Sequence, residues 1–179
     1  MFTLKAFSAM TLIAGATILS LPQKASSQGT STKGIKNVVL VHGAFADGSS
    51  WSKVITQLQA KGFYVVAVQN PLTSFNDDVA AAKRAIAHMD GPVLLVGHSY
   101  GGMVISEAGK DPKVAGLVYV AALIPEEGQN VQEVNAAMPT TGVEKLFNLN
   151  AEGFLSLPVK AVNEHFAQDV PLTERKLIY

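Results

Sequence analysis

Four short, continuous runs of apolar residues follow one another along the chain, and stretches of helical period separate them. The runs are rich in valine and show no polar alternation; they cover residues 38–41, 63–68, 93–96 and 114–121. Short β-branched runs of this kind are typical of strands that are buried on both faces. The pattern therefore predicts four strands of one parallel sheet.

Three helices are predicted between these strands, at residues 50–60, 74–89 and 101–109. Apolar residues recur at helical spacing in the first two, and the second begins with Ser74 and Asp77, which resemble a capping box. Strands that alternate with helices form parallel sheets with right-handed crossovers and helices on both faces. The predicted fold class is therefore α/β.

The regular alternation fades after the fourth predicted strand. Residues 125–179 are expected to form short amphipathic helices, broken by Pro139, Pro158 and Pro171, with no strand run of comparable quality. Because this segment follows the carboxyl end of the last strand, we expect it to form a helical cap-like region beside a core of residues 37–124.

The first 27 residues have the composition of a signal peptide. Lys5 supplies a positive charge, residues 6–21 are largely apolar and uncharged, and residues 25–27 are small, as cleavage requires. An uncleaved membrane anchor is the alternative, but the apolar run is shorter than the roughly 20 residues that span a bilayer. We therefore expect residues 1–27 to direct export to the periplasm or the medium, with no stable membrane span after cleavage. Residues 28–36 are polar and are expected to form a flexible tether.

Composition narrows the candidate chemistry. The chain has 14 Lys and Arg and 14 Asp and Glu, so no excess of charge favours nucleic acid or an acidic partner. It has no cysteine, which excludes a disulfide framework, a thiol nucleophile and a cysteine-based zinc site. The four histidines include no pair at the spacing of a helical metal site. No metal and no cofactor is expected.

A candidate nucleophile lies where the third predicted strand meets its helix. Residues 97–101 read Gly-His-Ser-Tyr-Gly, so that Ser99 stands between glycines. A tight strand-to-helix turn with small flanking residues presents a serine Oγ at the amino end of the helix. The N–H of Tyr100 would then face the position of a developing oxyanion, which the helix dipole also favours. A ligand-cradling glycine loop is the alternative, but the chain has neither of the phosphate-binding glycine motifs around this serine.

The end of the first predicted strand complements this turn. Residues 42–45 read His-Gly-Ala-Phe, and the N–H of Ala44 or of Phe45 can provide the second oxyanion donor. His42 is expected to orient this loop rather than to transfer protons. His98 is expected to pack or to line the pocket.

Three segments carry a wider resemblance. They are residues 37–51 (NVVLVHGAFADGSSW), 97–102 (GHSYGG) and 118–125 (VYVAALIP). Together they resemble the α/β-hydrolase superfamily and, more narrowly, bacterial relatives of the plant methylesterase and hydroxynitrile-lyase branch. The resemblance covers about residues 36–130, and the segment that includes residues 166–171 also resembles the cap of that family.

The resemblance implies a serine hydrolase that acts on small carboxylic esters through an acyl-serine intermediate. Ser99 is then the nucleophile, and the backbone N–H groups of Ala44 and Tyr100 form the oxyanion hole, with Phe45 as a further candidate donor. A hydroxynitrile lyase would use the same serine to move a proton. A remnant that binds a small ligand without turnover is the alternative outside enzymes.

A serine nucleophile also needs a base and a carboxylate that orients the base. In this fold the acid and then the histidine follow the serine in the chain. Here the histidine after Ser99 is His165, and the acidic residues just beyond the last strand are Glu126 and Glu127. Their order fits, but His165 lies in the cap-like segment rather than in a loop at the sheet edge.

The other explanation, which we favour, is a C-terminally truncated chain that has lost the last strands with their acid and base. Residues 114–123 would then form an exposed edge strand with unpaired backbone groups. In that case we expect a product that is weakly active or inactive and that associates with itself through this edge.

Overall fold

The computed structural model describes residues 34–138 and 142–178. The predicted signal peptide, residues 1–27, lies outside the described residues, so export stays a prediction. Of the predicted tether, residues 34–36 are described and belong to neither a helix nor a strand. Within the described ranges, no helix is both long enough and apolar enough to cross a membrane.

A four-stranded parallel sheet forms the centre of the fold. Its strands are β1 (Asn37–Val41), β2 (Tyr64–Ala67), β3 (Val93–His98) and β4 (Val114–Val120), in the order β2-β1-β3-β4. The four predicted strands are confirmed, and their ends differ from the prediction by no more than two residues. β1 is buried along its whole length because it pairs with a strand on each side.

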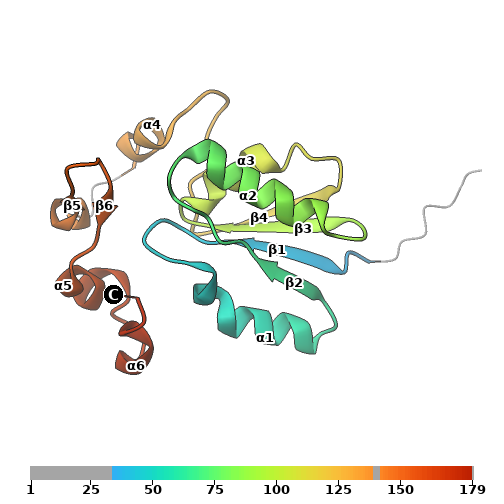
Figure 1. Cartoon of the computed structure of the whole chain (residues 1–179), viewed down its shortest axis with the longest axis horizontal. Helices are drawn as coiled ribbons and strands as arrows, with labels where there is room; N and C mark the ends of the chain where they lie inside the picture. The colour runs from blue at the N-terminus through green and yellow to red at the C-terminus, as the bar shows by residue number, and fades with distance from the viewer. Residues whose placement is uncertain (1–33, 139–141, 179) are drawn as a thin grey trace, which may run out of the picture. The chain divides into compact units, whose positions relative to one another are not determined.

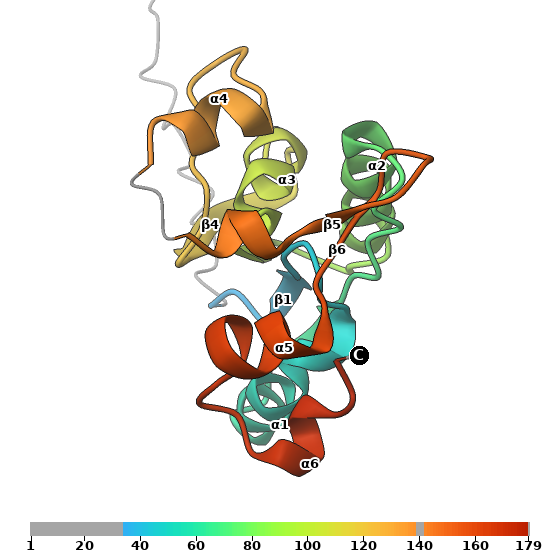
Figure 2. The same ribbon diagram turned by 90° about the vertical axis from the view of Figure 1, so that its left-hand side faces the viewer.

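Helices cover both faces of this sheet (Figure 1). On one face lies α1 (Ser52–Ala60), which a 3-10 turn at Gly48–Trp51 precedes; on the other face lie α2 (Phe75–Ala87) and α3 (Gly101–Ala108). The turned view in Figure 2 agrees, with β1 between α1 and the pair α2 and α3. The three predicted helices and the α/β fold class are therefore confirmed.

The core has one layer on each face of the sheet because side chains alternate along each strand. Val38 and Leu40 of β1 pack with Trp51 on the α1 face, whereas Val39 and Val41 belong to the larger cluster under α2 and α3. The predicted cap of α2 is also present, since the N–H of Asp77 donates to Ser74 Oγ at 3.1 Å.

The region after β4 is mainly helical, as predicted. It contains α4 (Val131–Ala136), α5 (Val159–Ala161), a π-helical turn at Val162–Phe166 and α6 (Leu172–Arg175), together with a 3-10 turn at Val143–Leu146.

Two very short strands in this region correct the sequence expectation of helices alone. β5 (Asn148–Leu149) and β6 (Leu155–Ser156) pair antiparallel. The cause is local: Asn150 Oδ1 accepts the N–H groups of Glu152 and Phe154, and Gly153 adopts the left-handed φ of 88° that closes the turn. Strands of two residues are too short to leave an alternating pattern in the sequence.

Candidate active site

The strand order changes direction between β1 and β3. After β1 the chain crosses to β2 on one side and then returns past β1 to β3 on the other side. The loops that follow the adjacent strands β1 and β3 therefore diverge, and such a switch point is where open α/β sheets bind ligands. The loop with His42 and the turn with Ser99 are these two loops.

Ser99 occupies a strained turn between β3 and α3. Its φ is 52°, in the left-handed region that residues other than glycine rarely adopt. Such strain costs about 1–3 kcal/mol and persists where the surroundings fix the backbone. Here the carbonyl of Ser99 accepts the N–H of Gly102 at 2.9 Å and the N–H of Leu123 at 3.0 Å. This is the geometry of the predicted turn.

Close backbone contacts explain the glycines around Ser99. A Cβ on Gly97 would lie 2.5 Å from the carbonyl oxygen of Gly101, and a Cβ on Gly101 would lie 2.5 Å from that of Val41. A Cβ on Gly43 would lie 2.9 Å from the Cβ of Ser99. The backbone of the β1 loop therefore runs directly beside the serine side chain.

Left-handed backbone is concentrated at this edge of the sheet. Among the described residues, the non-glycine residues with positive φ are Phe45, Leu72, Ser99 and Ala121, and each follows a different strand of the sheet. Because strained residues cluster at functional sites, this distribution points to the carboxyl edge as the site.

His42 is fully buried and holds the β1 loop. Its Nδ1 lies 2.8 Å from the carbonyl oxygen of Gly43, and the N–H of Asn70 donates to its Nε2 at 3.0 Å. Because a backbone N–H can only donate, Nε2 is the acceptor and Nδ1 carries the proton of the neutral ring. Both ring nitrogens are engaged, so His42 orients the loop, as predicted.

His98 packs beside the turn, also as predicted. Its ring meets the ring of Trp51 edge to face, with centroids 6.3 Å apart. Partial burial lowers the pKa of His98, because the charged imidazolium is the poorly solvated form there. His98 is therefore held neutral at lower pH than an exposed histidine.

The backbone N–H groups of the candidate oxyanion donors are free of other partners among the residues that the structure describes. Among residues 34–138 and 142–178, the N–H groups of Ala44, Phe45 and Tyr100 donate to no other backbone or side-chain group. Unpaired N–H groups next to a left-handed serine are what an oxyanion hole requires. Their assignment as oxyanion donors stays a prediction.

Asp78 is a residue of this site that the sequence reasoning missed. It is 1% exposed; its Oδ1 accepts the N–H of Leu72 at 2.8 Å, and its Oδ2 accepts the hydroxyl of Tyr100 at 2.7 Å. Burial and the bond to Asp78 raise the pKa of the Tyr100 phenol, which therefore remains a donor. One sequence signal was available: Asp78 shares the buried helix face of Ala82 and Ile86.

The predicted base and acid make no hydrogen bond or ion pair with the serine turn in the described part of the chain. His165 belongs to the π-helical turn, is half exposed, and has its Nε2 4.0 Å from a carboxylate oxygen of Glu164. Glu126 and Glu127 are exposed, and within the described ranges neither carboxylate bonds to a histidine. No hydrogen bond among the described residues joins His165 to Ser99, so these roles stay predictions.

Aromatic side chains connect the β1 loop to the region after β4. The ring of Phe45 lies 5.0 Å from that of Phe147 and 6.4 Å from that of Phe166, measured between centroids. A cavity of about 220 Å³ opens beside Phe45 and has mostly apolar walls, formed by Phe45, Leu155, Ser156, Leu157, Val162 and Ile178. This volume suits a small apolar group.

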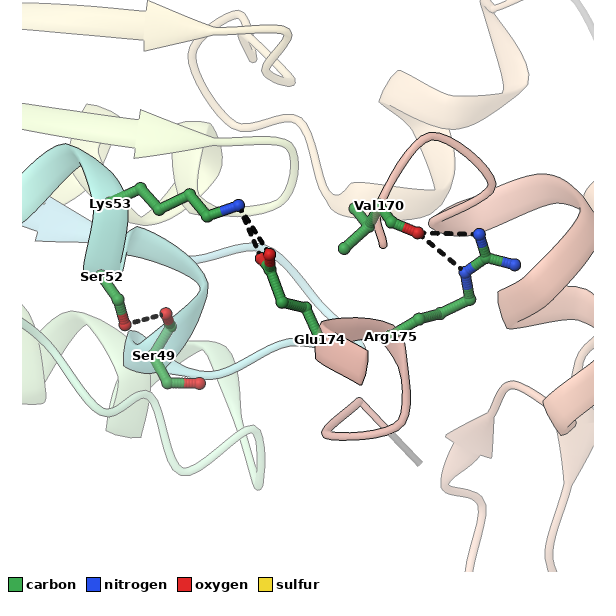
Figure 3. Close-up of polar contacts among 6 residues, drawn as sticks. All are labelled: Ser49, Ser52, Lys53, Val170, Glu174 and Arg175. Atoms are coloured by element: carbon green, nitrogen blue, oxygen red, sulfur yellow. Dashed lines mark hydrogen bonds and ion pairs between the residues drawn. The ribbon is translucent and has the colours of Figure 1, made fainter. Parts of the chain in front are cut away.

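Polar contacts hold the end of the same region (Figure 3). Lys53 of α1 forms an ion pair with Glu174 of α6 at 2.7 Å. The guanidinium of Arg175 donates to the carbonyl oxygen of Val170 through Nε at 3.2 Å and through Nη2 at 2.7 Å. It also donates to the carbonyl oxygens of Gln168 and Asn163. Arg175 thus ties α6 to the turn before it.

Comparison with known proteins identifies the family. Residues 38–177 match the model of the alpha/beta hydrolase family. The chain belongs to this family. The resemblance to the α/β-hydrolase superfamily is thereby confirmed, and the match includes both the sheet and the region after it.

Several relatives of this α/β hydrolase are named as esterases or hydrolases. Methylesterase 7 of Arabidopsis thaliana is 35% identical over 51% of the chain and 41% of its own length. A carbendazim hydrolyzing esterase of a Nocardioides species is 34% identical over 53% of the chain and 45% of its own length. The chain thus spans less than half the length of these two relatives.

Solved structures agree on the fold. A pyrethroid hydrolase is 26% identical, with a TM-score of 0.67, over 78% of this chain and 64% of that one. The tomato methylketone synthase I is 21% identical, with a TM-score of 0.66, over 80% of this chain and 64% of that one. The second likeness concerns the fold alone.

Proposed function

We propose that this α/β hydrolase is a serine esterase that cleaves small carboxylic esters with apolar groups. The observation that carries the proposal is the strained Ser99, at φ 52°, with the backbone of Gly43 packed against its side chain. A strained strand-to-helix turn of this kind supports a nucleophilic serine, because it presents the hydroxyl at the amino end of the helix that follows. The esterase names of the relatives support the same reaction class.

The reaction has two steps. Ser99 Oγ attacks the ester carbonyl carbon and loses its proton to a base, while the N–H groups of Ala44 and Tyr100 bind the oxyanion. The alcohol then leaves with a proton, and the acyl-serine forms. Water attacks this acyl-serine, and the carboxylic acid leaves Ser99 free. Removal of one oxyanion donor typically costs about a hundredfold to a thousandfold in kcat.

The cavity beside Phe45, which Ser99 does not line, supports an apolar substrate group. It is small, about 220 Å³, and its walls are mostly apolar. Ligand sites commonly combine such walls with a few polar groups that fix the reacting centre. A short acyl or alkoxy group next to the β1 loop fits this description better than a long chain or a charged substrate.

The proposal leaves the base and its orienting acid unassigned; His165, with Glu126 or Glu127, is the candidate pair that the chain order offers. The support is the chain order, because the acid and the histidine both follow Ser99. His165→Gln therefore belongs in the test, since loss of the base slows acylation more than loss of one oxyanion donor.

Acetylation by p-nitrophenyl acetate tests the proposal. We expect a burst of p-nitrophenol and the mass of one acetyl group on the tryptic peptide that contains Ser99. Ser99→Ala should remove both signals, at a loss of about a thousandfold or more in rate. Ser106→Ala is the matched control, because Ser106 Oγ bonds to the carbonyl of Gly102 and to the hydroxyl of Tyr119 within α3 and β4.

The other functions give different results when the ester is assayed alongside a cyanohydrin. Release of hydrogen cyanide from a cyanohydrin without an acetyl-serine would favour a hydroxynitrile lyase. Saturable binding of the ester without product would favour a ligand-binding remnant. Either result overturns the esterase proposal.

A further inference from the structure

Asp78 links two parts of the candidate site that are far apart in the sequence. Its carboxylate accepts one hydrogen bond from the N–H of Leu72, in the loop after β2, and another from the hydroxyl of Tyr100, in the turn after β3. Each carboxylate oxygen has its own donor. The side chain therefore works as a bridge between these two loops.

Burial makes this bridge stiff. A carboxylate that is 1% exposed is costly unless hydrogen bonds compensate it. Bonds to an ionised acceptor are roughly twice as strong as bonds between neutral groups. Asp78 also lies near the amino end of α2, where the helix dipole favours negative charge. Movement of Tyr100 away from Asp78 would leave this carboxylate short of a donor, so the structure opposes it.

The same loop also holds the other half of the site. Two residues before Leu72, the N–H of Asn70 donates to His42 Nε2, and Asn70 Nδ2 donates to the carbonyl oxygen of His42 at 3.2 Å. His42 in turn contacts Gly43, whose backbone lies against Ser99. Residues 70–72 thus connect the β1 loop to Asp78 and, through Asp78, to Tyr100.

The left-handed backbone of Leu72 adds to this connection. Its φ is 55°, which is unfavourable for leucine, and its N–H is the group that Asp78 Oδ1 accepts. A strained conformation persists when contacts fix it. The carboxylate therefore stabilises the shape of the loop as well as the position of Tyr100.

We propose that Asp78 is a positioning residue of the oxyanion hole, which fixes the backbone N–H of Tyr100 relative to the β1 loop. This inference rests on the proposed function, because it concerns the donors of that reaction. Asp78 itself touches no reacting atom. It acts on acylation through the phenol of Tyr100 and through residues 70–72.

Two substitutions break the bridge from opposite ends. Asp78→Asn keeps the shape of the side chain but leaves one acceptor oxygen for two donors. Tyr100→Phe deletes the hydroxyl alone and keeps the backbone N–H that binds the oxyanion. The matched control is Asp77→Asn, because the neighbouring carboxylate of Asp77 is exposed and bonds to Ser74 and Thr73 instead.

Acetylation kinetics give the first measurement. We expect Asp78→Asn and Tyr100→Phe each to lower the acylation rate constant about tenfold, with KM for the ester within about twofold, because misplaced donors weaken transition-state binding alone. The double variant should be no slower than the slower single variant, and Asp77→Asn should match the wild type. Multiplied effects in the double variant, or equal rates for Asp78→Asn and Asp77→Asn, would overturn the proposal.

Amide hydrogen exchange gives a second measurement that needs no catalysis. The peptide with residues 98–103 should exchange about tenfold faster in Asp78→Asn and in Tyr100→Phe, relative to β1 of the same variant. Unchanged exchange in both variants contradicts the proposal, whatever the activity. If the variants exchange faster than the wild type but the wild type forms no acetyl-serine, the esterase proposal fails. The exchange rates alone then decide whether Asp78 positions Tyr100.

Discussion

At the scale of single residues, the site depends on glycines, which have no side chain, as well as on Ser99. The turn after β3 lets the backbone of Gly101 approach residue 97 so closely that even a methyl group has no room. Ser99 then takes the left-handed conformation, with a φ of 52°. Two backbone bonds to its carbonyl hold it there.

Gly97→Ala should therefore disrupt the turn. The new Cβ would lie 2.5 Å from the carbonyl oxygen of Gly101. This oxygen belongs to the backbone and cannot move away without disturbing the turn. We expect a loss of at least about 3 kcal/mol in the free energy of unfolding, measured by urea denaturation. Gly91→Ala is the control, because the nearest atom to its Cβ is Asn37 Nδ2 at 3.6 Å, and it should change stability by about 0.5 kcal/mol or less. Equal stability of the two variants would contradict the crowding of this turn.

At the scale of elements, the last helix relies on hydrogen bonds more than on a buried face. α6 has four residues and buries none of its side chains. A helix of this length is too short to be stable alone. Arg175 compensates by donating to the carbonyl oxygens of Val170, Gln168 and Asn163. The ion pair of Lys53 and Glu174 is exposed, and pairs of this kind contribute little.

Arg175→Ala should consequently destabilise this region more than Lys53→Ala does. Loss of several charge-assisted bonds to carbonyl groups should cost about 1–2 kcal/mol, whereas loss of the exposed ion pair should cost less than about 1 kcal/mol. Hydrogen exchange of residues 159–178 measures both variants. If residues 159–178 exchange faster in Lys53→Ala than in Arg175→Ala, the ion pair, and not Arg175, holds α6.

At the scale of the whole molecule, β4 is one of the two edge strands of the sheet. In the described part of the chain it pairs with β3 on one side, and Val118 and Val120 are 38% and 40% exposed. An apolar edge strand with unpaired backbone groups is a template for pairing with a second chain. Self-association through β4 stays the prediction that the sequence pattern made.

Val118→Lys should lower this self-association, because a charged side chain on an edge strand opposes pairing with a second chain. Light scattering at increasing protein concentration should give a lower mean mass for this variant than for the wild type. Val54→Lys is the control, because Val54 is 39% exposed on α1, away from β4. A mean mass that falls equally in both variants, or a wild type that remains monomeric, would exclude the β4 edge as the contact.

The sequence by itself determined the four strands, the helices between them and the position of the candidate nucleophile. These features are local: a continuous valine run predicts a buried strand, and Gly97-His98-Ser99-Tyr100-Gly101 permits one kind of turn. The short strands β5 and β6 were not predicted, because they arise from hydrogen bonds of Asn150 rather than from an apolar pattern.

Only the tertiary structure decided which distant residues share the site. Asp78 is one of two consecutive aspartates in the sequence, and its burial depends on how α2 packs against α3 and the loop at Leu72. His42 carries its proton on Nδ1 because Asn70, 28 residues further on, donates to Nε2. A hydrogen bond between segments far apart in the chain has no local pattern, since its energy is gained only after the strands have paired. The sequence therefore determined the elements and the position of the candidate nucleophile, and the packing of loops at the carboxyl edge decided which residues lie against them.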